Sequence, residues 1–109
     1  MDDLHFIWDE DKNKKNQKKH GISFDEAKTV FFDENAIEFL DPDHSKEEDG
    51  FILLGFSFKL RMLIVCYCYR ENDTVIRIIL ARKATNKEKL NYGRWGYEIR
   101  IQFFKDERP

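Results

Sequence analysis

The stretch RMLIVCYCYRENDTVIRIILARK, residues 61–83, decides the fold. Residues 62–69 and 74–80 are rich in β-branched and aromatic side chains, which is the composition of β-strands. The polar residues 71–73 between them suit the tight turn of a hairpin. Because both runs are almost continuously apolar, we expect them at the centre of a sheet that helices cover on at least one face.

Three arginines interrupt this hairpin, namely Arg70, Arg77 and Arg82. Removing a cation from water is costly unless a partner offsets it, so each arginine needs an explanation. They either reach the rim of the sheet, pair with the acidic segment 41–49, or mark a site for an anion. In a regular strand Arg77 and Arg82 point to opposite faces, so a shared site requires the strand to end near Ala81.

Helices and further strands are predicted on both sides of the hairpin. Helix caps are suggested by Asp9, by Ser23 with Glu26, and by Thr85 with Glu88 three residues later. The predicted helices span 9–20, 23–31 and 83–92, further strands span 36–40 and 50–58, and residues 6–8 form a short strand or an anchor onto the core.

The length of 109 residues suits one domain with a single core. The order of elements predicts an α+β fold in which two N-terminal helices pack on a mainly antiparallel sheet and a C-terminal helix follows. We assign residues 1–92 to this domain. Residues 93–109 are a C-terminal extension, in which apolar and polar side chains alternate over 97–103 and predict an extra strand.

Charge is segregated along the chain although the net charge is only −2. Residues 25–49 contain ten acidic residues and two lysines, whereas residues 59–94 contain nine basic and three acidic residues. Local fields depend on where charges lie, so the second segment can bind an anionic ligand. No apolar run is long enough to span a membrane and no signal peptide is recognised, so we expect a cytoplasmic protein.

Two features could suggest a metal, and neither has the spacing of a metal site. Cys66 and Cys68 lie two residues apart, and a zinc site needs more ligands than this pair supplies. The acidic segment 41–49 does not follow the pattern of a calcium loop. We expect free core thiols, a solvated acidic loop, no metal and no cofactor.

The segment Lys19-His20-Gly21 has two interpretations. Cations in the last turn of a helix, followed by glycine, form an ordinary helix end. Histidine also titrates near neutral pH and is equally a candidate for moving protons. Residue chemistry alone favours the helix end and leaves proton transfer by His20 open.

Several blocks of the chain resemble the BrnT family, the toxins of bacterial type II toxin–antitoxin pairs. The blocks are FIWDEDKNKKNQKKHGISFDEA, the DPDHS loop, FILLGFS and IRIILARKAT, in the family's order over residues 6–92. The resemblance implies a fold of the RelE superfamily and a ribonuclease that inhibits translation and growth. It also implies a neutralising BrnA-type antitoxin in a hetero-oligomer, with DNA contacted only through that antitoxin.

The resemblance also assigns residues to roles. Lys19 and His20 match KHG, and the basic residues of the hairpin match the family's arginines, which gives the candidate catalytic set Lys19, His20, Arg70, Arg77 and Arg82. The candidate RNA-binding residues are Lys15, Arg61 and Lys83. Two positions depart from the family, because Gly50 stands where relatives often have arginine and Leu80 stands where they usually have serine.

The residue chemistry is compatible with RNA cleavage without a metal. Such a reaction aligns the ribose 2′-OH with the adjacent phosphate, stabilises charge at phosphorus and moves two protons. Arginine and lysine supply the electrostatic part, and His20, or Lys19 with a lowered pKa, can move protons. The alternative is a catalytically degenerate toxin-like domain that acts only as a protein-interaction module, which the departures at Gly50 and Leu80 allow.

Overall fold

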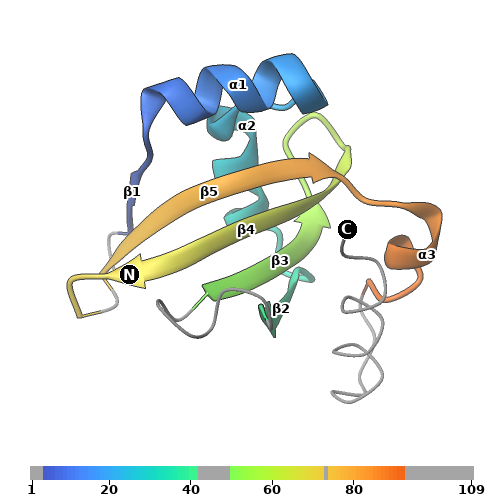
Figure 1. The fold of residues 1–109 in the computed structure, drawn as a ribbon. Coiled ribbons are helices and arrows are strands. Elements are labelled where there is room, and N and C mark those ends of the chain that lie inside the picture. Colours follow the sequence, from blue (N-terminus) through green and yellow to red (C-terminus); the bar gives the residue numbers. More distant parts are fainter. Residues whose placement is uncertain (1–3, 42–49, 73, 93–109) are drawn as a thin grey trace.

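The computed structural model describes residues 4–41, 50–72 and 74–92, and over these residues it forms a five-stranded sheet with short helices (Figure 1). The predicted strand of the C-terminal extension lies outside the described residues. The strands are β1 (His5–Ile7), β2 (Ile37–Leu40), β3 (Gly50–Phe56), β4 (Met62–Arg70) and β5 (Val75–Lys83), and the helices are α1 (Glu10–His20), α2 (Phe24–Thr29), the 3₁₀ turn η1 (Val30–Phe32) and α3 (Asn86–Lys89).

The sheet has the strand order β1-β5-β4-β3-β2. All neighbours are antiparallel except β1, which runs parallel to β5 and pairs only with residues 75–77. The predicted α+β fold with a mainly antiparallel sheet is confirmed. Of the two interpretations of residues 6–8, the structure selects a short edge strand, because Phe6 pairs with Ile76.

The predicted hairpin is β4 and β5 at the centre of the sheet. Its turn places Glu71 and Asn72 in the left-handed region, with φ of 50° and 58°. Turns of this hand match the twist of the two strands, and asparagine tolerates the conformation well. The sequence therefore predicted the pairing of these strands correctly from composition and turn chemistry.

The prediction that this strand ends near Ala81 is wrong, because β5 continues to Lys83. Between residues 78 and 80 the register shifts. Ile78 pairs with Tyr67 and Leu80 pairs with Cys66, which leaves Ile79 as an extra residue. Such a bulge reverses the alternation of side chains beyond it.

The bulge places Arg77 and Arg82 on the same face of the sheet. Arg77 pairs with Cys68 and Arg82 pairs with Ile64, and these two residues of β4 lie an even number of positions apart. Directly opposed residues share a face. The two arginines therefore share a face without the strand ending between them.

The C-terminal helix is shorter than the predicted span 83–92. The backbone stays with the sheet at Ala84, whose N–H donates to the carbonyl of Met62 at 2.9 Å. Helix α3 then begins after Thr85, which forms the predicted capping box with Glu88. The longer strand has displaced the start of the helix.

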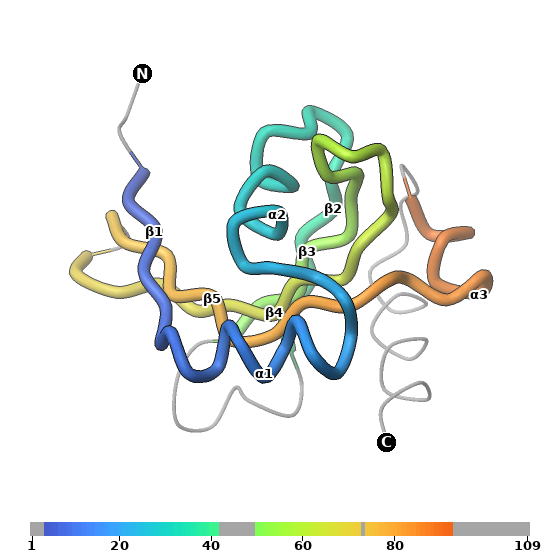
Figure 2. The backbone as a smooth tube through the Cα atoms, turned by 90° about the horizontal axis from the view of Figure 1, so that it is seen from above, coloured from blue at the N-terminus to red at the C-terminus, as the bar shows by residue number. Residues whose placement is uncertain are grey.

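The two N-terminal helices occupy different positions on the sheet. Helix α2 packs on one face, whereas α1 lies along β5 at the edge that β1 leaves open (Figures 1 and 2). Helix α1 has no apolar side chain, and its buried residues are Asn13 and Asn16. Hydrogen bonds rather than apolar packing therefore hold α1 in place.

Apolar side chains pack on both faces of the sheet. The cluster on the α2 face contains Ile22, Phe24, Ala27, Val30, Leu53, Leu63, Val65, Tyr67, Ile76, Ile78 and Ala81. The cluster on the opposite face contains Phe39, Ile52, Leu54, Ile64, Cys66 and Ala84. Cys66 and Cys68 are buried thiols that form no disulfide, as predicted.

Candidate active site

Asn16 fixes helix α1 against the open edge of β5. Its Nδ2 donates to the carbonyl of Ala81 at 2.8 Å, and its Oδ1 accepts the Ala81 N–H at 3.2 Å. The same Nδ2 donates to the carbonyl of Ile22 at 2.8 Å, just beyond the helix end. A side-chain amide thus replaces the neighbouring strand that β5 lacks here, and it aligns the C-terminal turn of α1 with the end of β5.

A groove runs between α1 and β5 along this edge. Its walls are basic on the helix side and apolar on the strand side, where the bulge residue Ile79 and its neighbour Leu80 lie. The lining residues are Lys12, Lys15, Asn16, Lys19, His20, Ile79 and Leu80. The structure therefore brings together the candidates Lys15, Lys19 and His20, and it adds Lys12.

Lys12 was not among the residues selected from the sequence. A signal was present, because Lys12, Lys15 and Lys19 follow the i, i+3, i+7 spacing of one helical face. The other α1 lysines, Lys14 and Lys18, do not line the groove.

His20 occupies the last turn of α1 and has an altered pKa. Partial burial, the positive charge of Lys19 and that of Arg82 lower the pKa of His20 below its usual value of 6.5. A lowered pKa favours the neutral imidazole near pH 7, and this form can accept a proton. Gly21 ends the helix in the left-handed conformation, with φ of 74°. The helix-end interpretation is therefore correct, and it is compatible with a role in proton transfer.

Arg82 is held in a defined orientation at the end of β5. Its Nη1 and Nη2 donate to the two carboxylate oxygens of Glu88, each at 2.8 Å. Glu88 is fully buried and also accepts the N–H of Thr85 at 2.9 Å. Burial by itself would raise the pKa of Glu88, but the hydrogen bonds from Arg82 and Thr85 lower it. Arg82 thus pairs with Glu88, a partner outside the predicted segment 41–49.

Arg61 is engaged by a buried acid. Its Nε donates to Oε2 of Glu26 at 2.9 Å, Nη2 makes a short ion pair with Oε1, and the Ser57 hydroxyl donates to Oε2 at 2.7 Å. Ser23 caps α2 as predicted, but the expected capping box is not completed, because the Glu26 carboxylate bonds to Arg61 and Ser57 rather than to the cap. Burial alone would raise the pKa of Glu26, and the bonds from Arg61 and Ser57 lower it. Arg61 therefore links α2 to the start of β4.

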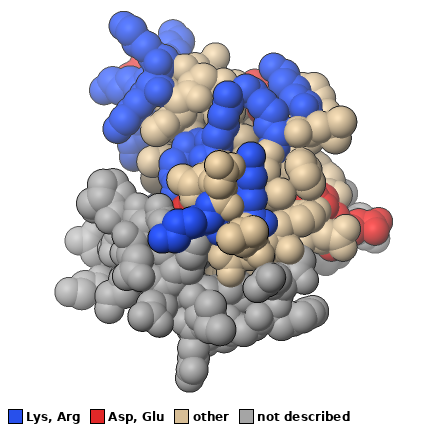
Figure 3. Space-filling view, turned by 90° about the vertical axis from the view of Figure 1, so that its right-hand side faces the viewer, with Lys and Arg blue, Asp and Glu red and all other residues tan. Residues whose placement is uncertain are grey.

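The cations at this end of the sheet form one surface. Arg61 Nη2 also donates to the carbonyl of Gly21 at 3.4 Å, next to His20. Lys83 is exposed directly after Arg82, and Lys83 and Lys89 both line a pocket. Figure 3 shows Lys and Arg side chains gathered over the described part of this end, with few acids between them. We call the surface of Lys12, Lys15, Lys19, His20, Arg82 and Lys83 the basic edge.

Arg70 and Arg77 lie at the other half of the sheet. Arg70 pairs with Val75 beside the hairpin turn, and Arg77 pairs with Cys68. Five residues of extended strand separate Arg77 from Arg82, which is roughly 16 Å. The structure therefore does not bring Arg70 and Arg77 to the basic edge, although Arg77 shares a face with Arg82.

The two positions that depart from the family lie in different places. Leu80 lines the groove beside Lys19 and His20. Gly50 is buried and pairs with Cys68, at the half of the sheet that holds Arg77. Only the leucine can influence a reaction at the basic edge directly.

No group of three or more His, Cys, Asp or Glu side chains that could hold a metal ion is found within residues 4–41, 50–72 and 74–92. Over the same residues, none of the helices has the length and apolar composition needed to cross a membrane.

Comparisons with known proteins agree with this architecture. Residues 8–88 match the family described as the ribonuclease toxin BrnT of type II toxin–antitoxin systems. The crystal structure of the Brucella abortus ribonuclease toxin BrnT is similar in fold, with a TM-score of 0.60 and 22% sequence identity, and the match covers 77% of this chain and 100% of that one. No curated protein matches the sequence. Because the family match extends over more than half of the chain, this chain belongs to the BrnT family of type II toxin–antitoxin ribonuclease toxins.

Proposed function

We propose that this protein cleaves RNA at the basic edge without a metal ion, and that it inhibits translation and growth. The observation that carries the proposal is the juxtaposition of His20, with its lowered pKa, and the oriented guanidinium of Arg82. Family membership supports ribonuclease activity, and the residues at this edge supply groups for each part of the chemistry.

The reaction is an intramolecular transfer at phosphorus. His20 accepts the proton of the ribose 2′-OH as its oxygen bonds to phosphorus, and the bond from phosphorus to the 5′-oxygen breaks. The leaving oxygen takes a proton from Lys19 or from water. The products are a 2′,3′-cyclic phosphate and a 5′-hydroxyl, so atoms and protons balance.

Charge stabilisation comes from cations fixed before the substrate arrives. Arg82 is oriented by Glu88 and stabilises the extra negative charge on the phosphate oxygens in the transition state. Lys12, Lys15 and Lys83 bind neighbouring phosphates along the edge. Arg61 acts mainly by holding α2 against β4, and Arg70 and Arg77 bind RNA away from the cleaved bond.

The test is RNA cleavage by the purified protein in the presence of excess EDTA. The wild-type protein should produce ends with 2′,3′-cyclic phosphate, and His20→Ala should lose at least about a hundredfold in rate. His5→Ala is the matched control, because His5 is exposed on β1 away from the groove. Cleavage that requires a divalent metal, or that survives His20→Ala at full rate, would contradict the proposal.

A second candidate function is a degenerate toxin-like domain that only binds its antitoxin. Leu80 in the groove and the engagement of Arg82 by Glu88 favour it, since both reduce the polar groups offered to RNA. This protein would leave RNA intact and still bind its partner.

The proposed partner is a BrnA-type antitoxin that forms a hetero-oligomer with this protein and carries the DNA-binding function. Membership of a toxin–antitoxin family implies an antitoxin. Induced expression should stop growth, and co-expression of the antitoxin should restore it. Growth arrest with RNA left intact would favour the second candidate function.

A further inference from the structure

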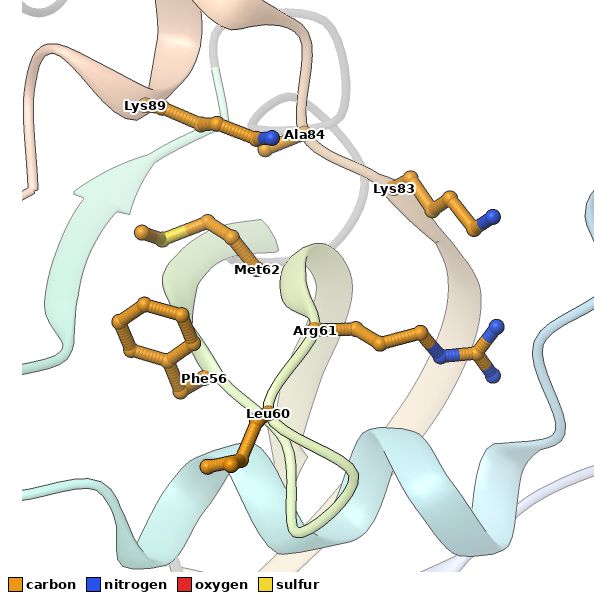
Figure 4. Close-up of a pocket in the computed structure, with 7 residues that line it drawn as sticks. All are labelled: Phe56, Leu60, Arg61, Met62, Lys83, Ala84 and Lys89. Atoms are coloured by element: carbon orange, nitrogen blue, oxygen red, sulfur yellow. The ribbon is translucent and has the colours of Figure 1, made fainter.

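A pocket of about 360 Å³ lies beside the basic edge, where the β3–β4 connection, the end of β5 and helix α3 meet (Figure 4). Apolar side chains form much of its lining, and cations stand at its rim. The apolar residues are Phe56, Leu60, Met62 and Ala84, and the cations are Arg61, Lys83 and Lys89. None of these described lining residues is acidic, so the pocket suits a ligand with an apolar, flat part and a negative charge.

Phe56 presents an aromatic ring to the pocket in a fixed orientation. Phe56 is 38% exposed, and Figure 4 shows its ring beside Met62, its partner across the two strands. The ring packs against Tyr92 in an edge-to-face arrangement, with ring centroids 5.2 Å apart and an interplanar angle of 79°. The Tyr92 hydroxyl donates to Asp33 at 2.8 Å, which fixes the tyrosine in turn. An oriented, partly exposed ring is the surface on which a nucleobase stacks.

The pocket lies next to the proposed site of cleavage. Met62 and Ala84 are joined by a backbone hydrogen bond of 2.9 Å, and the pairs that follow along the sheet are Leu63 with Lys83 and then Ile64 with Arg82. Register therefore places Phe56, Met62 and Arg82 on one face of the sheet. Lys83 belongs to both the pocket and the basic edge.

We propose that this pocket is a nucleobase subsite, in which the base of a nucleotide next to the cleaved bond stacks on Phe56 while Lys83 and Lys89 bind its phosphates. This inference rests on the proposed RNA cleavage, and it names a part of the substrate that the catalytic group does not contact. The lining offers contacts to the flat face of a base, so stacking and charge bind it rather than recognition of one particular base edge.

The test is a binding measurement that does not depend on cleavage. The probe is a fluorescent 2′-O-methyl oligoadenylate, whose attacking hydroxyl is blocked, and its counterpart is an abasic chain of equal length. Affinities for both probes are measured by anisotropy for the wild-type protein, Phe56→Leu and Phe58→Leu. Phe58 is the matched control, because it is an exposed phenylalanine two residues away that does not line the pocket.

Removal of the bases should weaken binding by the same factor in the wild-type protein and Phe58→Leu. In Phe56→Leu the ratio of the affinities for the oligoadenylate and the abasic chain should be smaller by about tenfold, because one stacked base contributes about this much to binding. Phe56→Trp should restore it. Equal factors in all variants, or no binding of the oligoadenylate by the wild-type protein, would overturn the subsite.

A surface variant makes the test independent of any effect on folding. Lys89→Gln should lower affinity for both probes and reduce the slope of log affinity against log salt by about 0.7, the value for one phosphate contact to a single strand. Lys87→Gln on the same helix should leave the slope unchanged. If Phe56→Leu and Lys89→Gln weaken only antitoxin binding, the pocket is a protein-docking surface and the inference is wrong.

These results separate the subsite from the proposed function. If Phe56→Leu reduces the effect of removing the bases but the wild-type protein leaves cleavable RNA intact, the protein has the subsite without the catalytic activity. If the protein cleaves RNA through His20 but Phe56→Leu leaves the effect of removing the bases unchanged, it has the activity without the subsite.

Discussion

Asn16 of helix α1 binds both the N–H and the carbonyl of Ala81 in β5, at 3.2 Å and 2.8 Å. The helix carries His20 one turn later, and the strand carries Arg82 in the next position. One buried amide therefore sets how the proposed proton acceptor and the proposed phosphate-binding cation are placed relative to each other.

Asn16→Ala should destabilise the protein and misplace His20. It leaves two buried backbone groups of Ala81 without this partner, which costs about 3 kcal/mol. Urea denaturation measures this loss, and cleavage assayed well below the midpoint should still fall. Gln17→Ala is the control on the same helix, because Gln17 is exposed and the hydrogen bond described for its side chain is to the side chain of Asn13. Equal stability of the two variants would show that the amide does not anchor the helix.

Lys19→Gln should raise the pKa of His20 toward its usual value of 6.5 without reaching it. Burial is the largest cause of the lowered pKa, and the charges of Lys19 and Arg82 follow. Because the neutral imidazole accepts the proton, kcat/KM should rise with pH through this pKa, below 6.5 in the wild-type protein and nearer to it in the variant. NMR titration of His20 measures the pKa directly. Lys14→Gln should not change it, and a shift of the same size there would argue against a specific effect.

Arg82→Lys should reduce cleavage by about a hundredfold, because an ammonium group cannot reproduce the two-pronged contact of a guanidinium with phosphate. It should also destabilise the protein, since the buried Glu88 loses one of the two hydrogen bonds that Arg82 donates to it. Glu88→Gln separates these effects, because it weakens the pair and retains the arginine. Thermal melting and cleavage are measured for both variants. If their activities fall in parallel with their melting temperatures, Arg82 acts only through the fold.

Leu80→Ser should increase cleavage by up to about tenfold. A hydroxyl in the groove can donate a hydrogen bond to phosphate, and the leucine cannot. Leu80→Ala is the control, because it removes the leucine without adding a hydroxyl. Single-turnover cleavage distinguishes them, and equal rates for the serine and alanine variants would exclude a role for the hydroxyl.

Arg61→Ala should affect stability more than RNA binding. The variant leaves Glu26, which is 1% exposed, without its ion-pair partner, and this costs about 3 kcal/mol. The pKa of Glu26 is lowered in the folded protein, so its ionised form stabilises the fold at pH values above the usual pKa of 4.5. This contribution to stability is lost as the pH falls from that value toward the lowered pKa. The difference in free energy of unfolding between the wild-type protein and Arg61→Ala, measured by denaturation at pH 7 and pH 4, should be smaller at pH 4. Lys59→Ala should have a much smaller effect at both pH values, because the charge of Lys59 contributes least to the lowered pKa of Glu26. RNA affinity lost without loss of stability would restore Arg61 to the RNA-binding set.

The sequence by itself determined the elements that depend on local interactions. The hairpin follows from two β-branched and aromatic runs with Glu71 and Asn72 between them. The starts of the helices follow from Asp9, Ser23 and Thr85, each of which accepts a backbone N–H of its own first turn. These features are predictable because the interacting residues are neighbours in the chain.

Only the tertiary structure decided which candidate residues meet. The bulge at Ile79 places Arg77 and Arg82 on one face, and no local signal marks an extra residue inside a continuous apolar strand. Arg61 and Glu26 are 35 residues apart, and Asn16 and Ala81 are 65 apart, so their contacts exist only after the sheet has formed. Composition identifies charges that need partners, but packing and register choose those partners, because a buried polar group bonds to whatever the fold brings within reach.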